Sequence, residues 1–121
     1  MDSPRVALIR RLFEHMEKND LPRAAEELLA HSSEDVVFEP HAAHGKEIRG
    51  HEALREFWSR FADEGLQLRA GVYSITEERD TVIVSGWVRT IDEGRLADTQ
   101  SRWIYRFNDQ DQVVSARVER A

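Results

Sequence analysis

The chain has 121 residues, a formal net charge of -6 and no cysteine. This size suits one domain with a single core, and a hydrophobic fraction of 40% is too high for a disordered chain. The acidic balance argues against nucleic-acid binding, because neutralising phosphates requires clustered Lys and Arg. No run approaches the roughly 20 apolar residues of a membrane span, and the polar start lacks the apolar stretch of a signal peptide. We therefore expect a cytoplasmic protein without membrane association.

Three helices are predicted in the first half of the chain. Ser3 and Pro4 can start the first helix, which ends near Asn19, and helical spacing relates Val6, Ile9, Leu12, Phe13 and Met16. Asp20 can cap the second helix, whose apolar side consists of Leu21, Ala25, Leu28 and Leu29. Positions i, i+3, i+4 and i+7 of the third helix hold Leu54, Phe57, Trp58 and Phe61, and Gly65 ends the helical half.

Strands are predicted around and after the third helix. Residues 35–39 form a short segment stopped by Pro40, which favours an edge strand. From residue 66 onward the apolar period becomes two, with short turns between strands at 66–78, 81–91, 96–107 and 113–120. Such long strands in a small sheet are expected to curl, with bends at Gly71 and Gly86. The expected fold is α+β, an antiparallel sheet curved around three helices.

This order of elements resembles the nuclear transport factor 2-like superfamily. The matching residues are Gly50, Glu52, Ala53, Leu54, Phe57 and Trp58 at the third helix, Asn19-Asp20-Leu21, Tyr105-Arg106-Phe107 and residues 113–117. Members include ketosteroid isomerase, SnoaL-like polyketide cyclases, scytalone dehydratase and limonene epoxide hydrolase. The resemblance implies a single SnoaL-like, cystatin-like domain over residues 1–121, a cone of four long strands plus a short edge strand. It also implies a pocket for a small apolar molecule, with no cofactor required, but it leaves the reaction open.

A comparison with ketosteroid isomerase argues against steroid isomerisation by that enzyme's mechanism. The position of the oxyanion-stabilising Tyr corresponds to Leu12, which cannot donate a hydrogen bond, and that of the protonated Asp corresponds to Trp103. The position of the general-base Asp corresponds to Glu39 if the prolines are aligned, and to Pro40 if the strands are aligned without a gap. A shift of one residue reverses the face of the strand to which the side chain points.

The candidate catalytic residues are Glu39, His41 and His44. A carboxylate at the mouth of an apolar cavity would have its pKa raised by desolvation, which suits Glu39 as a base. His41 or His44 could act as a second acid or base. The same three side chains could instead bind a divalent metal, although the loop spacing alone does not predict a metal site, or they could be ordinary solvated surface groups.

Alternation along the last strands, read with the family comparison, predicts which side chains face the helices. We expect a ligand pocket lined by Leu12, Met16, Trp58, Val88, Thr90, Ser101, Trp103, Tyr105 and Arg120. Arg120 could also pair with Glu39. The alternative is that the aromatic side chains simply fill the core.

The other sheet face is predicted to pair two copies of the chain. It carries Ile83, Trp87, Arg89, Arg102 and Ile104, an apolar patch with an arginine rim. A covering segment of the chain is the alternative to a homodimer. Three functions therefore stay open: a cofactor-independent isomerase, dehydratase, cyclase or epoxide hydrolase, a non-catalytic ligand-binding domain, and a dimeric interaction module.

Overall fold

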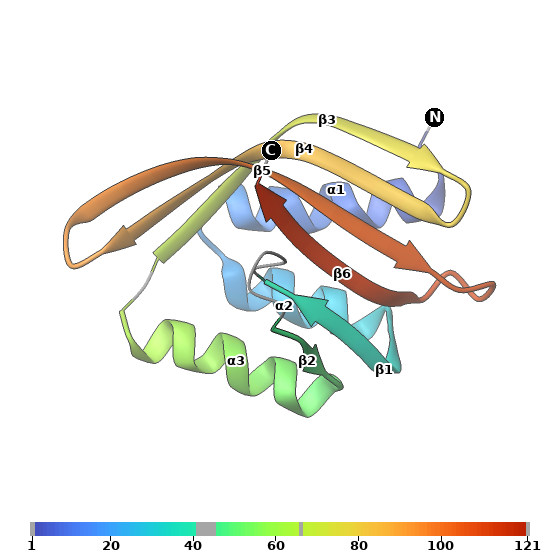
Figure 1. Cartoon of the computed structure of the whole chain (residues 1–121), viewed down its shortest axis with the longest axis horizontal. Helices are drawn as coiled ribbons and strands as arrows, with labels where there is room; N and C mark the ends of the chain where they lie inside the picture. Colours follow the sequence, from blue (N-terminus) through green and yellow to red (C-terminus); the bar gives the residue numbers. More distant parts are fainter. Residues whose placement is uncertain (1, 41–45, 66, 121) are drawn as a thin grey trace.

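Three helices and a six-stranded sheet make up the computed structural model, which describes residues 2–40, 46–65 and 67–120, apart from the side chain of residue 62 (Figure 1). The elements, in chain order, are α1 (Pro4–Glu17), α2 (Leu21–Ala30), β1 (Ser32–Glu39), β2 (Ile48–Arg49), α3 (His51–Asp63), β3 (Gln67–Glu78), β4 (Thr81–Asp92), β5 (Arg95–Phe107) and β6 (Val113–Arg120).

Side-chain caps fix where the first two helices begin. The hydroxyl of Ser3 accepts a hydrogen bond from the backbone N–H of Val6 at 3.2 Å, and the carboxylate of Asp20 accepts one from that of Arg23 at 3.3 Å. Each cap satisfies an amide that has no partner inside its helix. The predicted starts of both helices are confirmed, and the long strands agree with their predicted ranges to within one residue at the described ends.

The sheet has the strand order β2-β1-β6-β5-β4-β3. The predicted antiparallel meander of β3 to β6 is confirmed, but β1 pairs in parallel with β6 and antiparallel with β2. The prediction of β1 as an edge strand was therefore wrong, and the sheet is mixed. Pro40 ends β1 without removing any donor from it, so both sides of the strand can pair, and the two-residue β2 forms the edge.

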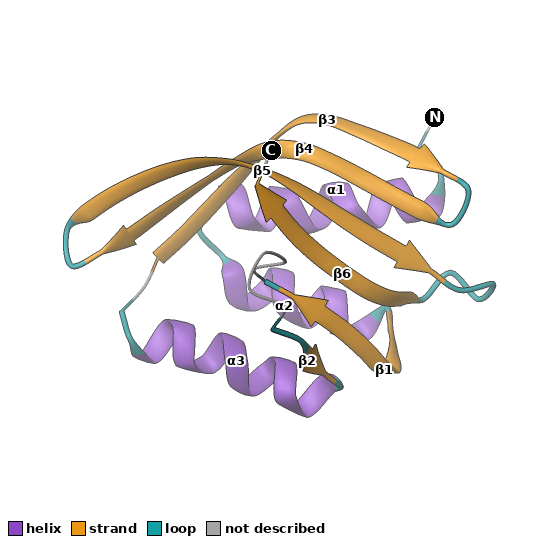
Figure 2. Ribbon diagram, in the orientation of Figure 1, coloured by secondary structure: helices purple, strands orange, loops and turns teal. Residues whose placement is uncertain are grey.

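The predicted bend lies where two glycines are diagonal neighbours on β3 and β4, with Gly71 opposite Trp87 and Gly86 opposite Val72. A register shift between Val72 and Ser74 leaves Tyr73 as an extra residue in β3. A Cβ at Gly71 would lie 2.3 Å from the indole nitrogen of Trp87, and one at Gly86 would lie 2.0 Å from the carbonyl oxygen of Gly71. Only glycine fits at these two positions, where the sheet bends over the helices (Figure 2).

The core lies between α1 and the concave face of the sheet. The ring of Phe13 packs edge-on against that of Trp103, with 4.8 Å between centroids. Over residues 82–86 of β4 and 101–107 of β5 the residues that face the helices are buried, whereas their neighbours are partly or fully exposed, as the predicted alternation requires. The buried apolar side chains include Ile9, Leu12, Leu29, Leu54, Val82, Val84, Trp103, Tyr105, Phe107 and Val113.

Candidate functional site

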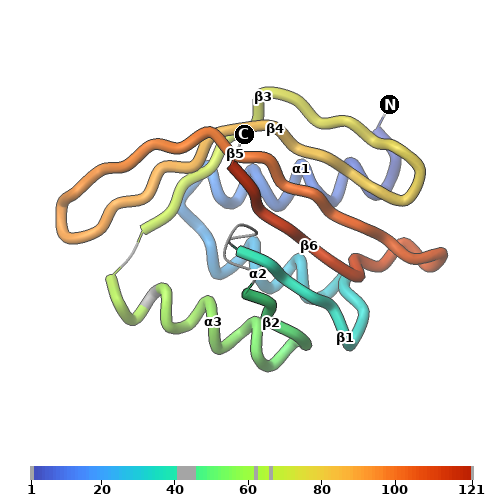
Figure 3. Tube along the Cα trace, viewed as in Figure 1, coloured from blue at the N-terminus to red at the C-terminus, as the bar shows by residue number. Residues whose placement is uncertain are grey.

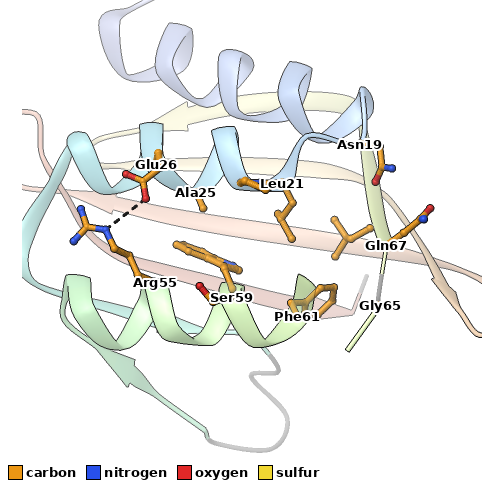
Figure 4. A pocket seen from close by; sticks show the side chains of 12 residues that line it. Asn19, Leu21, Ala25, Glu26, Arg55, Ser59, Phe61, Gly65 and Gln67 are labelled. Atoms are coloured by element: carbon orange, nitrogen blue, oxygen red, sulfur yellow. Dashed lines mark hydrogen bonds and ion pairs between the residues drawn. The ribbon is translucent and has the colours of Figure 1, made fainter. Parts of the chain in front are cut away.

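A groove runs between α2 and α3 and is closed at one side by the start of β3 (Figure 4). Its volume is about 490 Å³, within the range of small-molecule sites. The residues that line it are Asn19, Leu21, Pro22, Ala25, Glu26, Arg55, Trp58, Ser59, Phe61, Gly65, Gln67 and Leu68.

The middle of the groove is apolar because helical spacing turns matching faces of α2 and α3 toward each other. Leu21 and Ala25 are four residues apart on α2, and Trp58 and Phe61 are three apart on α3. The indole of Trp58 also packs against Phe38 of β1, with 5.6 Å between ring centroids. Trp58 and Phe61 are only half-buried, so this apolar surface is accessible to a ligand.

Polar side chains occupy the two ends of the groove. At one end Arg55 of α3 pairs with Glu26 of α2, with 3.4 Å between Nε and Oε1, and both side chains are more than half exposed. Asn19 and Gln67 lie at the other end (Figure 4). The groove therefore combines an apolar middle, a charged end and an amide end.

Glu39 does not face the helices. In the β1–β6 register Phe38 lies beside Ala116 and Glu39 beside Arg117. Phe38 packs on the aromatic rings of α3, so Glu39, the next residue along the strand, points to the outer sheet face. Its Oε2 lies 3.9 Å from Nε of Arg117. Glu39 thus forms an ion pair with Arg117 and not the predicted pair with Arg120.

The other predicted catalytic residues, His41 and His44, lie outside the described residues. His51 opens α3, and its Nε2 lies 3.0 Å from the carbonyl oxygen of Ser33. Within residues 2–40, 46–65 and 67–120, no cluster of three or more His, Asp or Glu side chains could hold a metal ion.

Of the predicted pocket residues, only Trp58 lines the groove. Five belong to the buried core, namely Leu12, Met16, Ser101, Trp103 and Tyr105. Val88 and Thr90 are half-buried on the concave face, and Arg120 is exposed. Burial raises the pKa of the Tyr105 phenol, so its hydroxyl stays protonated.

The sequence interpretation missed the groove residues on α2 and the polar side chains of α3. It assigned the apolar side of α2 to the core, and the structure buries Leu28 and Leu29 there but turns Leu21 partly toward the groove. The polar side chains of α3 could have been predicted from their spacing. Arg55 and Ser59 are four residues apart and lie on the same side of the helix as Trp58, so polar groups beside the apolar stripe were to be expected.

A second hollow, of about 590 Å³, lies at the bend of the sheet. Its lining includes Tyr73, Trp87 and the ion pair of Arg89 with Asp98, whose Nε and Oδ1 are 2.8 Å apart. Tyr73 is 64% exposed, while Trp87 rests on Gly71 and is half-buried. The hydrogen bond from Arg89 lowers the pKa of the Asp98 carboxyl.

The tube in Figure 3 traces the arrangement that defines the class of this protein, a bent meander over three helices with β1 inserted beside the last strand. This is the α+β cone of nuclear transport factor 2-like proteins. Within that class the chain belongs to the SnoaL-like domain family, whose model matches residues 9–116.

Solved structures support this assignment of the fold. An NTF2-like protein of unknown function from Burkholderia pseudomallei has a TM-score of 0.80 at 20% identity, covering 99% of this chain and 92% of that one. A provisionally assigned SnoaL-like polyketide cyclase from Jannaschia sp. CCS1 has a TM-score of 0.76 at 19% identity, covering 98% of this chain and 88% of that one. An LEH-like epoxide hydrolase of Mycobacterium tuberculosis has a TM-score of 0.76 at 12% identity, covering 97% of this chain and 82% of that one. No curated protein matches the chain.

Among the described helices, none has both the length and the apolar composition needed to cross a bilayer.

Proposed function

We propose that this SnoaL-like domain binds a small, largely apolar molecule in the groove between α2 and α3. The observation that supports this most directly is the half-buried Trp58 in an apolar groove of about 490 Å³ with polar side chains at both ends. Such a composition is typical of small-molecule sites, in which apolar area supplies affinity and a few polar groups set orientation.

Binding without proton transfer fits the groove better than catalysis does. Its titratable side chains among the described residues are Glu26 and Arg55, and they pair with each other. Glu39 is on the outer face beside Arg117. The acid–base hypothesis therefore depends on His41 and His44, and it stays a prediction. If a turnover is found, replacement of both histidines by alanine tests it, because the hypothesis predicts that the activity is lost.

Calorimetric titration with 1-octanol, a neutral apolar probe, tests the binding site. Trp58→Ala should weaken binding at least about fivefold, because the truncation removes the largest apolar side chain of the groove. Ser59→Trp should block the groove from an exposed position that leaves the core intact. Tyr73→Ala, at an exposed aromatic residue outside the groove, is the matched control. Equal binding by the wild type and both groove variants would contradict the proposal.

We also propose that the outer sheet face pairs two copies of the chain. Trp87, Ile83 and Ile104 are partly exposed there, although no helix of the described chain covers that face. The face carries charges of both signs, since Arg89 pairs with Asp98, and Arg102 with Glu119. A patch with both signs can be complementary to itself, which a two-fold symmetric interface requires.

A further inference from the structure

We infer that the ligand of the α2–α3 groove carries a terminal carboxylate, held by Arg55. The inference rests on the proposed function and adds the chemical class of the ligand: an apolar body with one carboxylate end. It follows from the contacts of Arg55, from its position on α3 and from the neighbours of Glu26.

The guanidinium of Arg55 is only lightly engaged. Its single polar contact among the described residues joins Nε to Oε1 of Glu26 at 3.4 Å, near the limit for a hydrogen bond. An arginine has five N–H donors in a planar fork that matches both oxygens of a carboxylate. Most of these donors are therefore available to a second carboxylate.

The position of Arg55 places these donors beside the apolar middle of the groove. Trp58 and Ser59 follow at i+3 and i+4, so the three side chains lie on one face of α3, within about one helical turn. A carboxylate at Arg55 would leave the attached carbon chain against the Trp58 indole. The Ser59 hydroxyl, on the same face, can donate a further hydrogen bond to it.

Glu26 gives a competing possibility, an ammonium end. An ammonium has three donors, and its acceptors must surround one point. On α2 the groove neighbours of Glu26 are Leu21, Pro22 and Ala25, whose side chains offer no acceptor. The donors on α3 thus suit a carboxylate better than the acceptors on α2 suit an ammonium. Glu26 instead competes with the ligand for Arg55.

The experiment compares three probes that share one alkyl chain: octanoate, 1-octanol and octylamine. Each is titrated calorimetrically into the wild type, Arg55→Gln and Glu26→Gln at low ionic strength. The measured quantity is the ratio of the dissociation constants of octanol and octanoate, because this ratio cancels the contribution of the apolar body. Arg60→Gln is the matched control, since Arg60 lies on α3 outside the groove and is similarly exposed and paired, with Glu56.

The ratio should fall about fivefold in Arg55→Gln, the effect of losing a partly exposed charge-assisted bond, and rise about threefold in Glu26→Gln, which removes the competing carboxylate. It should stay unchanged in Arg60→Gln. If octanol binds and the ratio is the same in all variants, or if octylamine binds more tightly than octanoate, the carboxylate assignment is wrong while the groove stands. If none of the probes binds to the wild type, both the assignment and the proposed function fail.

Discussion

Helices α1 and α3 are similar in length and in apolar pattern, yet they contribute to the molecule in different ways. α1 buries six side chains, from Val6 to Met16, against α2 and the concave face of the sheet. Among the described side chains of α3, only Leu54 is buried, and the three aromatic residues are partly exposed. α1 thus lies on the side of the cone whose burial stabilises the fold, and α3 lies on the side that we propose binds a ligand.

The difference comes from what each helix faces. α1 packs directly on the sheet, mainly on β3. Its Phe13 ring also meets Trp103 of β5, and no accessible apolar surface is left at that contact. α3 reaches the sheet through the ring of Phe38 at 5.9 Å from Phe57, and the groove separates it from α2 and the start of β3. An aromatic residue at helical spacing therefore marks either a core or a binding surface, and only the opposing element distinguishes them.

The largest expected effect is the loss of stability when a side chain of α1 is truncated. Leu12→Ala should lower the free energy of unfolding by about 3 kcal/mol, because the site is 2% exposed and the rigid sheet cannot collapse into the cavity. Phe61→Ala removes a larger side chain from the groove, yet it should cost only about 1 kcal/mol, since that ring is already partly exposed to solvent. Urea denaturation of both variants measures the two values.

Equal losses in the two variants would contradict the division of the helical layer into a stabilising side and a binding side. Leu96→Ala provides the control for truncation at an exposed site, because Leu96 is 58% exposed at the start of β5 and should change stability by less than about 0.5 kcal/mol.

Most of the fold could be predicted from the sequence because its signals are local. The Ser3 and Asp20 caps, the change of period from 3.6 to two and the turns between strands each depend on a few neighbouring residues. The parallel pairing of β1 with β6 depends instead on residues about 80 positions apart, such as Phe38 and Ala116, and no local pattern specifies it.

The candidate site was less predictable because a shift of one residue in the pairing of β1 changes which side chains face the helices. Glu39 and Phe38 are adjacent, and which of them faces α3 depends on the pairing of β1. The predicted inward row on β5 was correct as a face, since Trp103 and Tyr105 are buried. Whether that face lines a cavity or a filled core depends on Phe13 of α1, which occupies the space in front of Trp103.

The outer face of the sheet allows a second test of the contrast between buried and partly exposed aromatic residues. Trp87 is half-buried there, like Trp58 and unlike the buried Trp103. If partial burial of a tryptophan marks a binding surface, Trp87→Ser should weaken self-association at least about tenfold, as expected for an interface anchor. Sedimentation equilibrium of the wild type and the variant measures this change. A monomeric wild type, or a dimer that the variant leaves intact, would contradict pairing through this face, and Trp58→Ser should not affect it.

The smallest expected effect concerns the charges between α1 and α2. Burial would raise the pKa of Glu27, but the hydrogen bonds and charges of Arg11 and His15 outweigh it and hold the pKa below its ordinary value of 4.5. A lowered pKa in the folded state stabilises the protein above that value and ceases to do so as the pH falls through the folded-state pKa. Glu27→Gln should therefore cost less than about 1 kcal/mol at pH 7, with the difference from wild type shrinking below pH 4.5. Denaturation at a series of pH values tests this, with Glu56→Gln as the exposed control. A loss at pH 7 comparable to that of Leu12→Ala would mean that these charges hold α1 in place as strongly as burial does, and would contradict the predicted order of the two effects.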